Sequence, residues 1–234
     1  MTKIFAHRGY RAKYPENTLL AFRKAIETGC DGIELDVQLS KDGEIVIIHD
    51  ESVDRTTNGS GAVCDMAYAE LRGLDAGLGE RIPLLSEYFD LDEGLPLITN
   101  IDLKNNVVPY EGMEKKVLEM VRSYGLSDRV IFSSFNHESV NKIKKLASDI
   151  PCGYICWGKL DGEALVESMK RTGVEFIHPG LESINEVFME VVRRYNLRIS
   201  VWTVNSINET KRMIELGAYG VFSDDPLLLQ KIEL

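Results

Sequence analysis

The chain has 234 residues, of which 44% are hydrophobic and 27% charged, and its net charge at pH 7 is −10. These values are typical of a folded globular protein and exclude disordered and fibrous classes. The negative charge, together with the lack of any run rich in Lys and Arg, makes nucleic acid an unexpected partner. The length fits one catalytic domain over residues 1–234.

The sequence contains no targeting signal or membrane-spanning stretch that we recognise. The opening residues MTKIFAHRG lack a basic segment followed by a long apolar one, and no window approaches 18 consecutive apolar residues. We therefore expect a cytoplasmic protein without a transmembrane segment. The cysteines form no CxxC pair, and we expect small buried residues rather than a metal or redox site: Cys30, Cys64, Cys152 and Cys156.

Short apolar runs alternate with helical periodicity along the chain. The predicted strands are Lys3–Ala6, Gly32–Gln38, Glu44–His49, Leu97–Lys104, Val130–Ser134, Cys152–Cys156, Phe176–His178, Arg198–Thr203 and Gly220–Ser223. The predicted helices are Thr18–Thr28, Pro109–Tyr124, His137–Ser148, Asp161–Thr172, Ile184–Tyr195, Ile207–Leu216 and Pro226–Ile232. We expect Asn17 to cap the first helix and Gly29 to end it.

One pair of predicted strands cannot be parallel. Only LSKDG separates Gly32–Gln38 from Glu44–His49, whereas a parallel crossover needs about a dozen residues. A hairpin turning at Asp42-Gly43 is therefore expected, and its register would set His49 opposite Glu34. The eight remaining strands, separated by helices, predict a (β/α)₈ TIM barrel with parallel strands.

Residues 50–96 are too long for a simple connection between a strand and a helix. They contain the Gly-, Ser- and Thr-rich segment RTTNGSGAV and two short predicted helices, near Met66–Arg72 and Ser86–Leu91. Long insertions on a compact barrel usually have a function of their own. We expect this one to form a lid or a specificity element over the active face.

Acidic residues gather at the ends of two predicted strands. Glu34 and Asp36 alternate with aliphatic residues, so both carboxylates point to the same face of the strand. Asp102 repeats this pattern on the next barrel strand. Unpaired buried carboxylates are costly, and oxygen ligands of this kind hold a divalent cation. The alternative is a structural ion network with Arg8 and Lys104.

Two histidines also end predicted strands near these acids. His7 and His49 would flank the carboxylates, where imidazoles can transfer protons near neutral pH. Arg8 and Lys104 add positive charge that suits an anionic group such as phosphate. A structural role stays the alternative for the pair, and it is the role that we expect for His137 and His178.

Other apolar residues allow two interpretations each. The aromatic residues at strand ends either line an apolar wall of the site or pack at the barrel rim: Phe135, Tyr154 and Trp202. Apolar residues on one predicted helix either serve an interface, such as that of a homodimer, or pack against the barrel: Met189, Val191 and Val192.

The motifs taken together resemble the glycerophosphodiester phosphodiesterase family. They follow in order from residue 4 to about residue 226: HRG, PENT, ELD, HD, RTTNGSG, IPLLSE, NIDLK, SSF, WTVN and SDDP. Any one motif is weak, but their joint order is highly specific. The resemblance implies a (β/α)₈ barrel that hydrolyses glycerophosphodiesters to glycerol 3-phosphate and an alcohol with Mg²⁺ or Ca²⁺, and it equates the stretch after the hairpin with the family's insertion at the substrate site.

The resemblance also assigns roles to individual residues. It implies metal ligation by Glu34, Asp36 and Asp102, acid/base catalysis by His7 and His49, and phosphate neutralisation by Arg8 and Lys104. The family often has Glu where this chain has Asp102, one methylene shorter, so metal affinity and preference are open. A lysophospholipase D-type phosphodiesterase and a non-catalytic barrel that binds glycerophosphodiesters are the alternative functions.

Overall fold

The computed structural model describes residues 2–92 and 94–229. Its strands are β1 (Lys3–His7), β2 (Gly32–Leu39), β3 (Ile45–Ile47), β4 (Ile98–Leu103), β5 (Val130–Ser134), β6 (Cys152–Cys156), β7 (Phe176–Pro179), β8 (Arg198–Val201) and β9 (Gly220–Ser223). Its α-helices are α1 (Leu19–Glu27), α2 (Tyr68–Gly73), α3 (Leu85–Leu91), α4 (Met113–Ser123), α5 (His137–Leu146), α6 (Gly162–Thr172), α7 (Glu186–Tyr195), α8 (Ile207–Glu215) and α9 (Pro226–Leu229). Single 3₁₀ turns are η1 (Val63–Asp65) and η2 (Leu181–Ser183).

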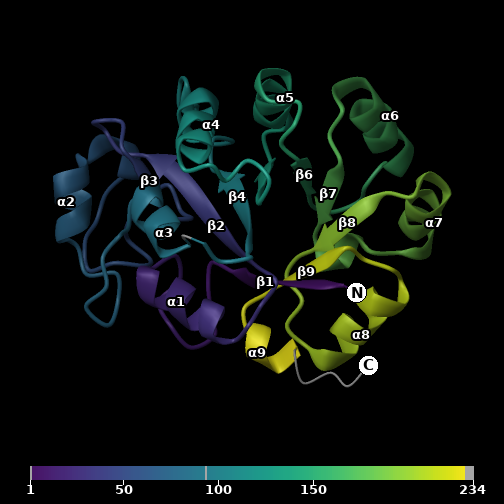
Figure 1. Cartoon of the computed structure of the whole chain (residues 1–234), viewed down its shortest axis with the longest axis horizontal. Helices are drawn as coiled ribbons and strands as arrows, with labels where there is room; N and C mark the ends of the chain where they lie inside the picture. The colour runs from purple at the N-terminus through teal and green to yellow at the C-terminus, as the bar shows by residue number, and fades with distance from the viewer. Residues whose placement is uncertain (1, 93, 230–234) are drawn as a thin grey trace.

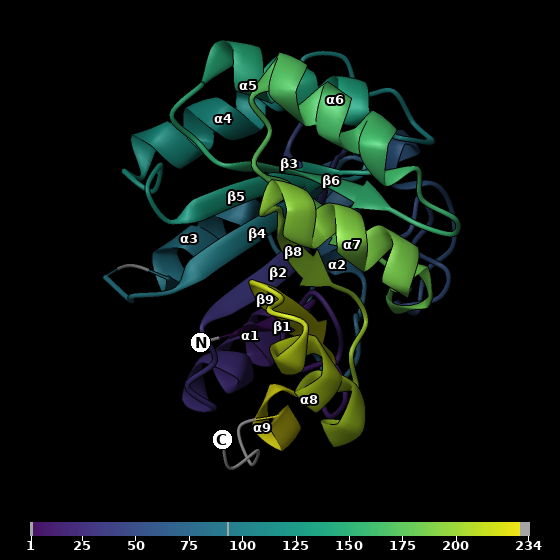
Figure 2. The same ribbon diagram turned by 90° about the vertical axis from the view of Figure 1, so that its right-hand side faces the viewer.

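Eight parallel strands close into a barrel. The order β1-β9-β8-β7-β6-β5-β4-β2 is joined into a ring because β1 also pairs with β2. At the closing seam His7 pairs with Glu34 on one side of β1, and Lys3 pairs with Gly220 on the other. Helices surround the strands in both views (Figures 1 and 2). The predicted TIM barrel is confirmed.

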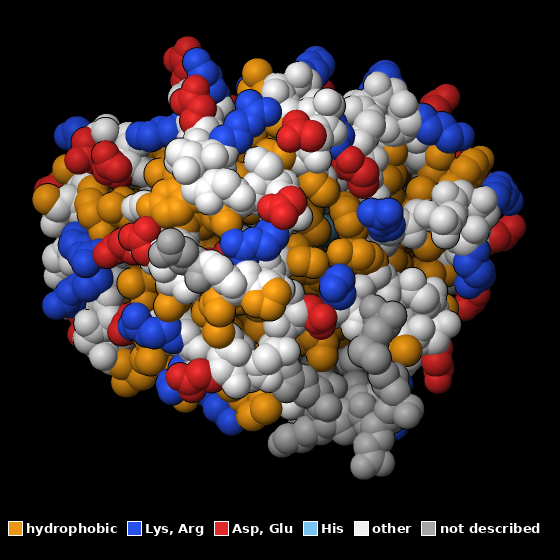
Figure 3. All heavy atoms as spheres, in the orientation of Figure 1, with side chains coloured by type: hydrophobic (Ala, Val, Ile, Leu, Met, Phe, Trp, Pro, Cys, Tyr) orange, Lys and Arg blue, Asp and Glu red, His pale blue; other side chains and the backbone are white. Residues whose placement is uncertain are grey.

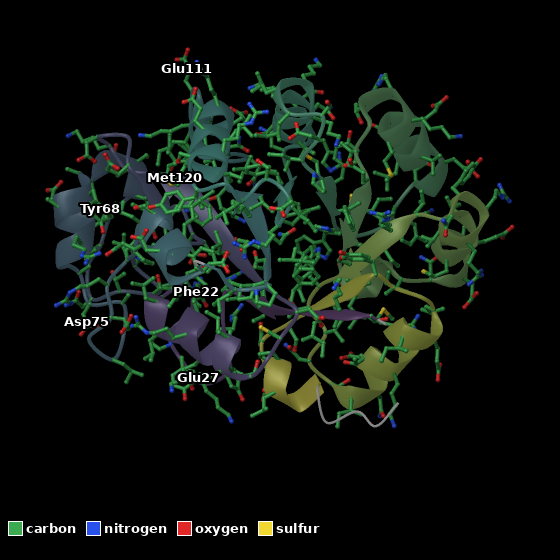
Figure 4. All side chains as sticks on the ribbon, in the orientation of Figure 1. Phe22, Glu27, Tyr68, Asp75, Glu111 and Met120 are labelled. Carbon is green, nitrogen blue, oxygen red and sulfur yellow. The ribbon has the colours of Figure 1, made fainter. Side chains whose placement is uncertain are left out.

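Successive side chains of β2 point alternately to the helices outside the barrel and to its interior. Ile33, Leu35 and Val37 belong to the main apolar core beneath the helices. Glu34 and Asp36, between them, point into the barrel and line its cavity. Phe22 of α1 reaches toward this core, whereas Glu27 at the end of the same helix points outward (Figure 4). The strand pattern therefore separates an apolar shell from a polar interior.

The predicted hairpin forms, but its register differs by one residue. β3 pairs antiparallel with β2 through Val37↔Ile47 and Leu39↔Ile45. Continued outward, this register places His49 opposite Leu35 rather than Glu34. The turn explains the difference, because the backbone N–H of Ser40 donates to the carbonyl of Glu44 and so shifts the turn by one position. β3 also ends at Ile47, so that His49 leaves the strand.

The residues after the hairpin pack around an apolar cluster of their own. This insertion cluster consists of buried side chains separate from the main core: Val46, Ile48, Val53, Val63, Leu71 and Ile82. The two predicted short helices appear as α2 and α3. Since α3 contributes Leu85, Tyr88 and Phe89 to the main core, the insertion is held to the barrel at its end.

Several helix ends differ from the sequence expectation. Thr18, not Asn17, caps α1, because its hydroxyl accepts from the backbone N–H of Ala21 while the Asn17 amide is used elsewhere. α4 begins at Met113 rather than Pro109, after Gly112 at φ 76°. The predicted last helix extends to Ile232, and its residues 230–232 lie outside the described part of the chain. No helix among the described residues has the length and apolarity to cross a membrane.

Candidate functional site

A cavity of about 410 Å³ opens at the carboxyl ends of the barrel strands. It is lined by His7, Arg8, Glu34, Asp36, His49, Asn100, Asp102, Lys104, Phe135, Ile155, His178, Trp202 and Phe222. The cavity therefore brings together residues from both ends of the chain and from most of the barrel strands.

Three carboxylates in this cavity form a cluster that could hold a metal ion. One oxygen each of Glu34, Asp36 and Asp102 lies within 4.8 Å of the others, and all three residues are buried. Burial and the neighbouring Asp36 raise the pKa of Glu34 well above its usual range, and burial likewise raises the pKa of Asp102. Oδ1 of Asp102 has no hydrogen-bond partner among the described atoms. Because the cluster lacks sufficient countercharge, its donor set fits a hard divalent cation.

Two basic side chains compensate part of this negative charge. Nζ of Lys104 lies 3.3 Å from Oδ2 of Asp102 and 3.9 Å from Oδ1 of Asp36. Nε of Arg8 lies 3.3 Å from Oδ2 of Asp36. Burial opposes ionisation of Asp36, but the neighbouring cations Arg8 and Lys104 favour it, and the pKa of Asp36 lies below the usual range. The site therefore holds cationic groups directly beside the acidic cluster.

The HRG motif shapes the backbone beside the carboxylates. Arg8 adopts a left-handed conformation at φ 55°, and its N–H donates to Oε2 of Glu34 at 2.9 Å. Gly9 follows at φ 77°, and a Cβ there would lie 2.8 Å from backbone and side-chain atoms of Ala21. Only glycine fits this position without strain. The motif thus lets the chain turn sharply between β1 and α1.

Each candidate catalytic histidine is paired with an aspartate. Nδ1 of His7 lies 2.7 Å from Oδ1 of Asp224, and Nδ1 of His49 lies 2.6 Å from Oδ1 of Asp50. Burial lowers the pKa of His7, and the hydrogen bond to Asp224 opposes this effect. Because an ionised carboxylate only accepts, each imidazole carries a proton on Nδ1 and presents Nε2 for chemistry.

The PENT motif supports the site from the loop before α1. Glu16 accepts hydrogen bonds from Arg8 at 2.8 Å and from Arg55 of the insertion at 2.8 Å. These arginines hold the pKa of Glu16 at about 2 against the effect of its burial. Asn17, at φ 56°, donates from Nδ2 to Oδ2 of Asp36 at 2.8 Å. The motif therefore contacts the acidic cluster through Asn17, and the insertion is linked to the cluster indirectly, through Arg55, Glu16 and Arg8.

The three aromatic residues proposed from strand ends divide into two groups. Phe135 and Trp202 line the cavity and pack edge to face, with ring centroids 5.7 Å apart. Tyr154 does not line the cavity, so the prediction that it forms part of an apolar wall of the site is wrong. Alternation along β6 sends Tyr154 outward, where its hydroxyl contacts Asn141, Ser168 and Thr172 on the helices.

Sequence reasoning missed several residues that the structure brings to the site. Asp224, Asp50 and Glu16 stand in motifs that resemble the family, yet no role was derived for them. Asn100 alternates with Asp102 along β4, and this period could have revealed it. His178 was expected to be structural, but it lines the cavity.

The surface charges and the side chains of α7 concern two further expectations from the sequence. Lys and Arg side chains are interspersed with Asp and Glu on the face in Figure 3. Met189, Val191 and Val192 are buried within the single chain. The packing of α7 against the rest of the chain accounts for their apolar character.

Comparisons with known proteins identify the family. The model of the glycerophosphoryl diester phosphodiesterase family matches residues 7–228. A glycerophosphodiester phosphodiesterase of Caldanaerobacter subterraneus subsp. tengcongensis is 41% identical over 96% of this chain and 95% of its own. A crystal structure of a Thermotoga maritima glycerophosphodiester phosphodiesterase has a TM-score of 0.85 and 31% identity, covering 100% of this chain and 99% of that one. An Oleispira antarctica phosphodiesterase solved with the product sn-glycerol-3-phosphate has a TM-score of 0.89 and 29% identity, covering 98% and 96%. The chain therefore belongs to the glycerophosphoryl diester phosphodiesterase family and is a phosphoric diester hydrolase.

Proposed function

We propose that the enzyme hydrolyses glycerophosphodiesters to sn-glycerol 3-phosphate and an alcohol by metal-dependent acid/base catalysis. The observation that carries this proposal is the meeting of three features in one cavity: an acidic cluster, two cationic side chains, and two imidazoles that are each paired with an aspartate. The partner is then a small-molecule substrate, and a cytoplasmic location stays the expectation from the sequence.

Glu34, Asp36 and Asp102 would hold the cation, Mg²⁺ or Ca²⁺, since their oxygens converge. When bound, such an ion neutralises phosphate charge and orients the phosphoryl group. The three carboxylates outnumber Arg8 and Lys104 by one. A divalent ion would leave one net positive charge, which matches the single negative charge of a phosphodiester.

Arg8 and Lys104 bind the non-bridging phosphate oxygens in this proposal. Lys104 is buried, the Arg8 side chain is 12% exposed, and both are already oriented by carboxylates, so that little side-chain entropy is lost when substrate binds. Phe135 and Trp202 provide an apolar wall beside the leaving alcohol. The insertion, linked to the site through Arg55, would serve as the lid or specificity element.

The hydrogen bond between Lys104 and His49 supports a division of roles in which His49 is the base and His7 the acid. Nζ of Lys104 lies 3.3 Å from Nε2 of His49. A lysine ammonium can only donate, so Nε2 of His49 is the acceptor and carries no proton. His49 is thereby ready to take the proton of the nucleophile, which is water or the substrate's own 2-hydroxyl. His7, in the form that carries protons on both ring nitrogens, then gives its Nε2 proton to the departing alkoxide as the bond between phosphorus and that oxygen breaks, and keeps its Nδ1 proton in the hydrogen bond to Asp224.

An assay of glycerol 3-phosphate release tests the function. Glycerophosphocholine should be hydrolysed, activity should disappear in EDTA, and Mg²⁺ or Ca²⁺ should restore it. His7→Ala and His49→Ala should each lower kcat by about 10²- to 10⁴-fold. His137→Ala, outside the cavity, is the matched control. Full activity in chelator would refute the metal dependence, and full turnover of either cavity variant would refute its catalytic role.

The same assay separates the proposal from its alternatives. Preference for lysophosphatidylcholine over glycerophosphocholine would indicate a lysophospholipase D. Binding of glycerophosphocholine in calorimetry without any product would indicate a non-catalytic barrel.

A further inference from the structure

His178 is a buried imidazole in the cavity for which the reaction above has no use. It lies on β7 with 1% of its surface exposed, and neither ring nitrogen has a hydrogen-bond partner among the described atoms. We propose that His178 and Asn100 form the floor of the cavity and bind a hydroxyl group on the glycerol part of the substrate. The inference rests on the proposed function and adds to it the residues that recognise glycerol.

The imidazole occupies a space that the neighbouring strand leaves open for it. A Cβ on Gly153 would lie 2.9 Å from both Cε1 and Nε2 of His178. Gly153 has no left-handed backbone that would call for glycine, so the close approach of the ring accounts for the residue. The rings of Phe222 and Phe176 pack nearby, with centroids 5.1 and 6.1 Å from that of His178. The ring is therefore held in place by groups that cannot satisfy its nitrogens.

Such an arrangement is costly without a ligand. A buried polar group without a partner destabilises the folded protein, and an apolar side chain beside Phe176 and Phe222 would avoid that cost. Burial lowers the pKa of His178 to about 3, so the ring is uncharged near neutral pH. A neutral imidazole has one N–H donor and one acceptor nitrogen. The two nitrogens lie on different edges of the ring, so a hydroxyl in the cavity can meet one of them, as a donor or an acceptor according to the tautomer of His178.

Asn100 offers a second unsatisfied group at the same cavity. Its Nδ2 donates to Oγ of Ser133 at 2.8 Å, which fixes the orientation of the amide. Its Oδ1 is buried and has no partner among the described atoms. Asn100 therefore contributes a hydrogen-bond acceptor, beside the one ring nitrogen of His178 that a hydroxyl can meet.

A hydroxyl group is the part of the substrate that matches this floor. Hydroxyls donate and accept, whereas phosphate oxygens only accept and find their countercharge at Arg8 and Lys104. Depth supports the same orientation, because Phe135 at the mouth is 36% exposed and Asn100 only 2%. Glycerol would point inward to His178, and the leaving alcohol outward.

Product binding tests the inference independently of catalysis. Calorimetry in Mg²⁺ would compare sn-glycerol 3-phosphate with two analogues, propane-1,2-diol 1-phosphate and propane-1,3-diol phosphate, which lack the terminal and the middle hydroxyl. Wild-type protein should bind one analogue at least about tenfold more weakly than the product, because the analogue leaves buried groups unpaired. The readout is the ratio of the Kd of that analogue to the Kd of the product. In His178→Phe this ratio should fall to within about twofold of unity, and Asn100→Leu should lower it as well.

Matched variants separate recognition from packing. His137→Phe removes an imidazole that stacks on Tyr154 outside the cavity, and it should keep the wild-type ratio. His178→Gln keeps a donor and an acceptor and should retain part of the ratio. Gly153→Ala keeps the imidazole but displaces it, so the ratio should fall, and this variant serves if His178→Phe does not fold.

Two results would overturn the inference. One is equal affinity of the wild-type protein for the product and both analogues; the other is an unchanged ratio in both His178→Phe and Gly153→Ala. Failure of the proposed function looks different, since the wild-type protein would then release no glycerol 3-phosphate from glycerophosphocholine whatever the binding ratios are.

Discussion

Nδ1 of His7 lies 2.7 Å from Oδ1 of Asp224, although 217 positions separate the two residues. β1 and β9 pair side by side, and this seam carries the histidine and the aspartate to the same rim of the barrel. Asn205 donates to the other carboxylate oxygen at 2.9 Å and so fixes the aspartate in turn. The imidazole is therefore oriented by a residue near the opposite end of the chain.

Asp224→Asn should lower kcat about 10- to 100-fold with little change in KM, since Asp224 orients an imidazole rather than binding substrate. The hydrogen bond that Nδ1–H of His7 donates to Asp224 opposes the lowering of the His7 pKa by burial. Its loss should lower that pKa and move the corresponding limb of the pH–rate profile to lower pH. Asp225→Asn is the neighbouring control, and an equal effect of both variants would contradict a specific role for Asp224.

Arg55→Ala should lower kcat about fivefold, because it releases Asp50, the partner of His49, together with Glu16. Arg55 is also the main reason that the pKa of Asp50 lies near 2. Arg72→Ala is a close control, since Arg72 is 45% exposed against 47% for Arg55 and pairs with Glu87 of α3 instead. Steady-state kinetics of the two variants should differ. A similar loss in both would mean that the insertion needs its ion pairs only for stability.

Asp102→Asn should weaken metal binding at least about tenfold, because it removes one negative ligand from the acidic cluster. Asp102→Glu keeps the charge and lengthens the side chain by one methylene, so its affinity should stay within about tenfold of wild type. Calorimetric titration with Mg²⁺ and with Ca²⁺ measures both effects without substrate. Wild-type affinity in the asparagine variant would remove Asp102 from the ligand set.

Stability should fall as the pH is lowered below 6.5, in part because of His178. In the folded protein burial holds the pKa of this imidazole near 3, while its ordinary value is 6.5. Between these pH values the unfolded chain binds a proton that the folded chain does not. The free energy of unfolding therefore falls by about 1.4 kcal/mol for each pH unit below 6.5, which amounts to about 2 kcal/mol at pH 5. When the free energy of unfolding is measured in denaturant at several pH values from 4 to 7, it should decrease less steeply with falling pH in His178→Phe than in the wild-type protein. Parallel curves would mean that His178 is protonated in the fold.

Local patterns in the sequence were enough to predict most of the barrel and its acidic cluster. Alternation along the strand was enough to place Glu34 and Asp36 on the inner face, and the short connection after them was enough to predict a hairpin. The register slipped by one residue because it depends on the hydrogen bonds of the turn, which composition does not reveal.

Features that join distant strands could not be derived in this way. The pairing of His7 with Asp224 depends on how the barrel closes, and the space for His178 depends on a glycine of the neighbouring strand. Tyr154 was misplaced for a related reason. Tyr154 is the middle residue of β6, and successive residues of a strand face the cavity and the helices in turn. Which of the two faces Tyr154 takes is known only once the strand is aligned with its neighbours.

The insertion cluster gives the barrel a degree of evolutionary freedom. Its apolar side chains, from Val46 to Ile82, satisfy one another separately from the main core. Loops between them can change length or sequence while the residues beneath the helices keep their packing. Under the proposed role of the insertion as a specificity element, such changes would alter which alcohols are released and leave the acidic cluster as it is.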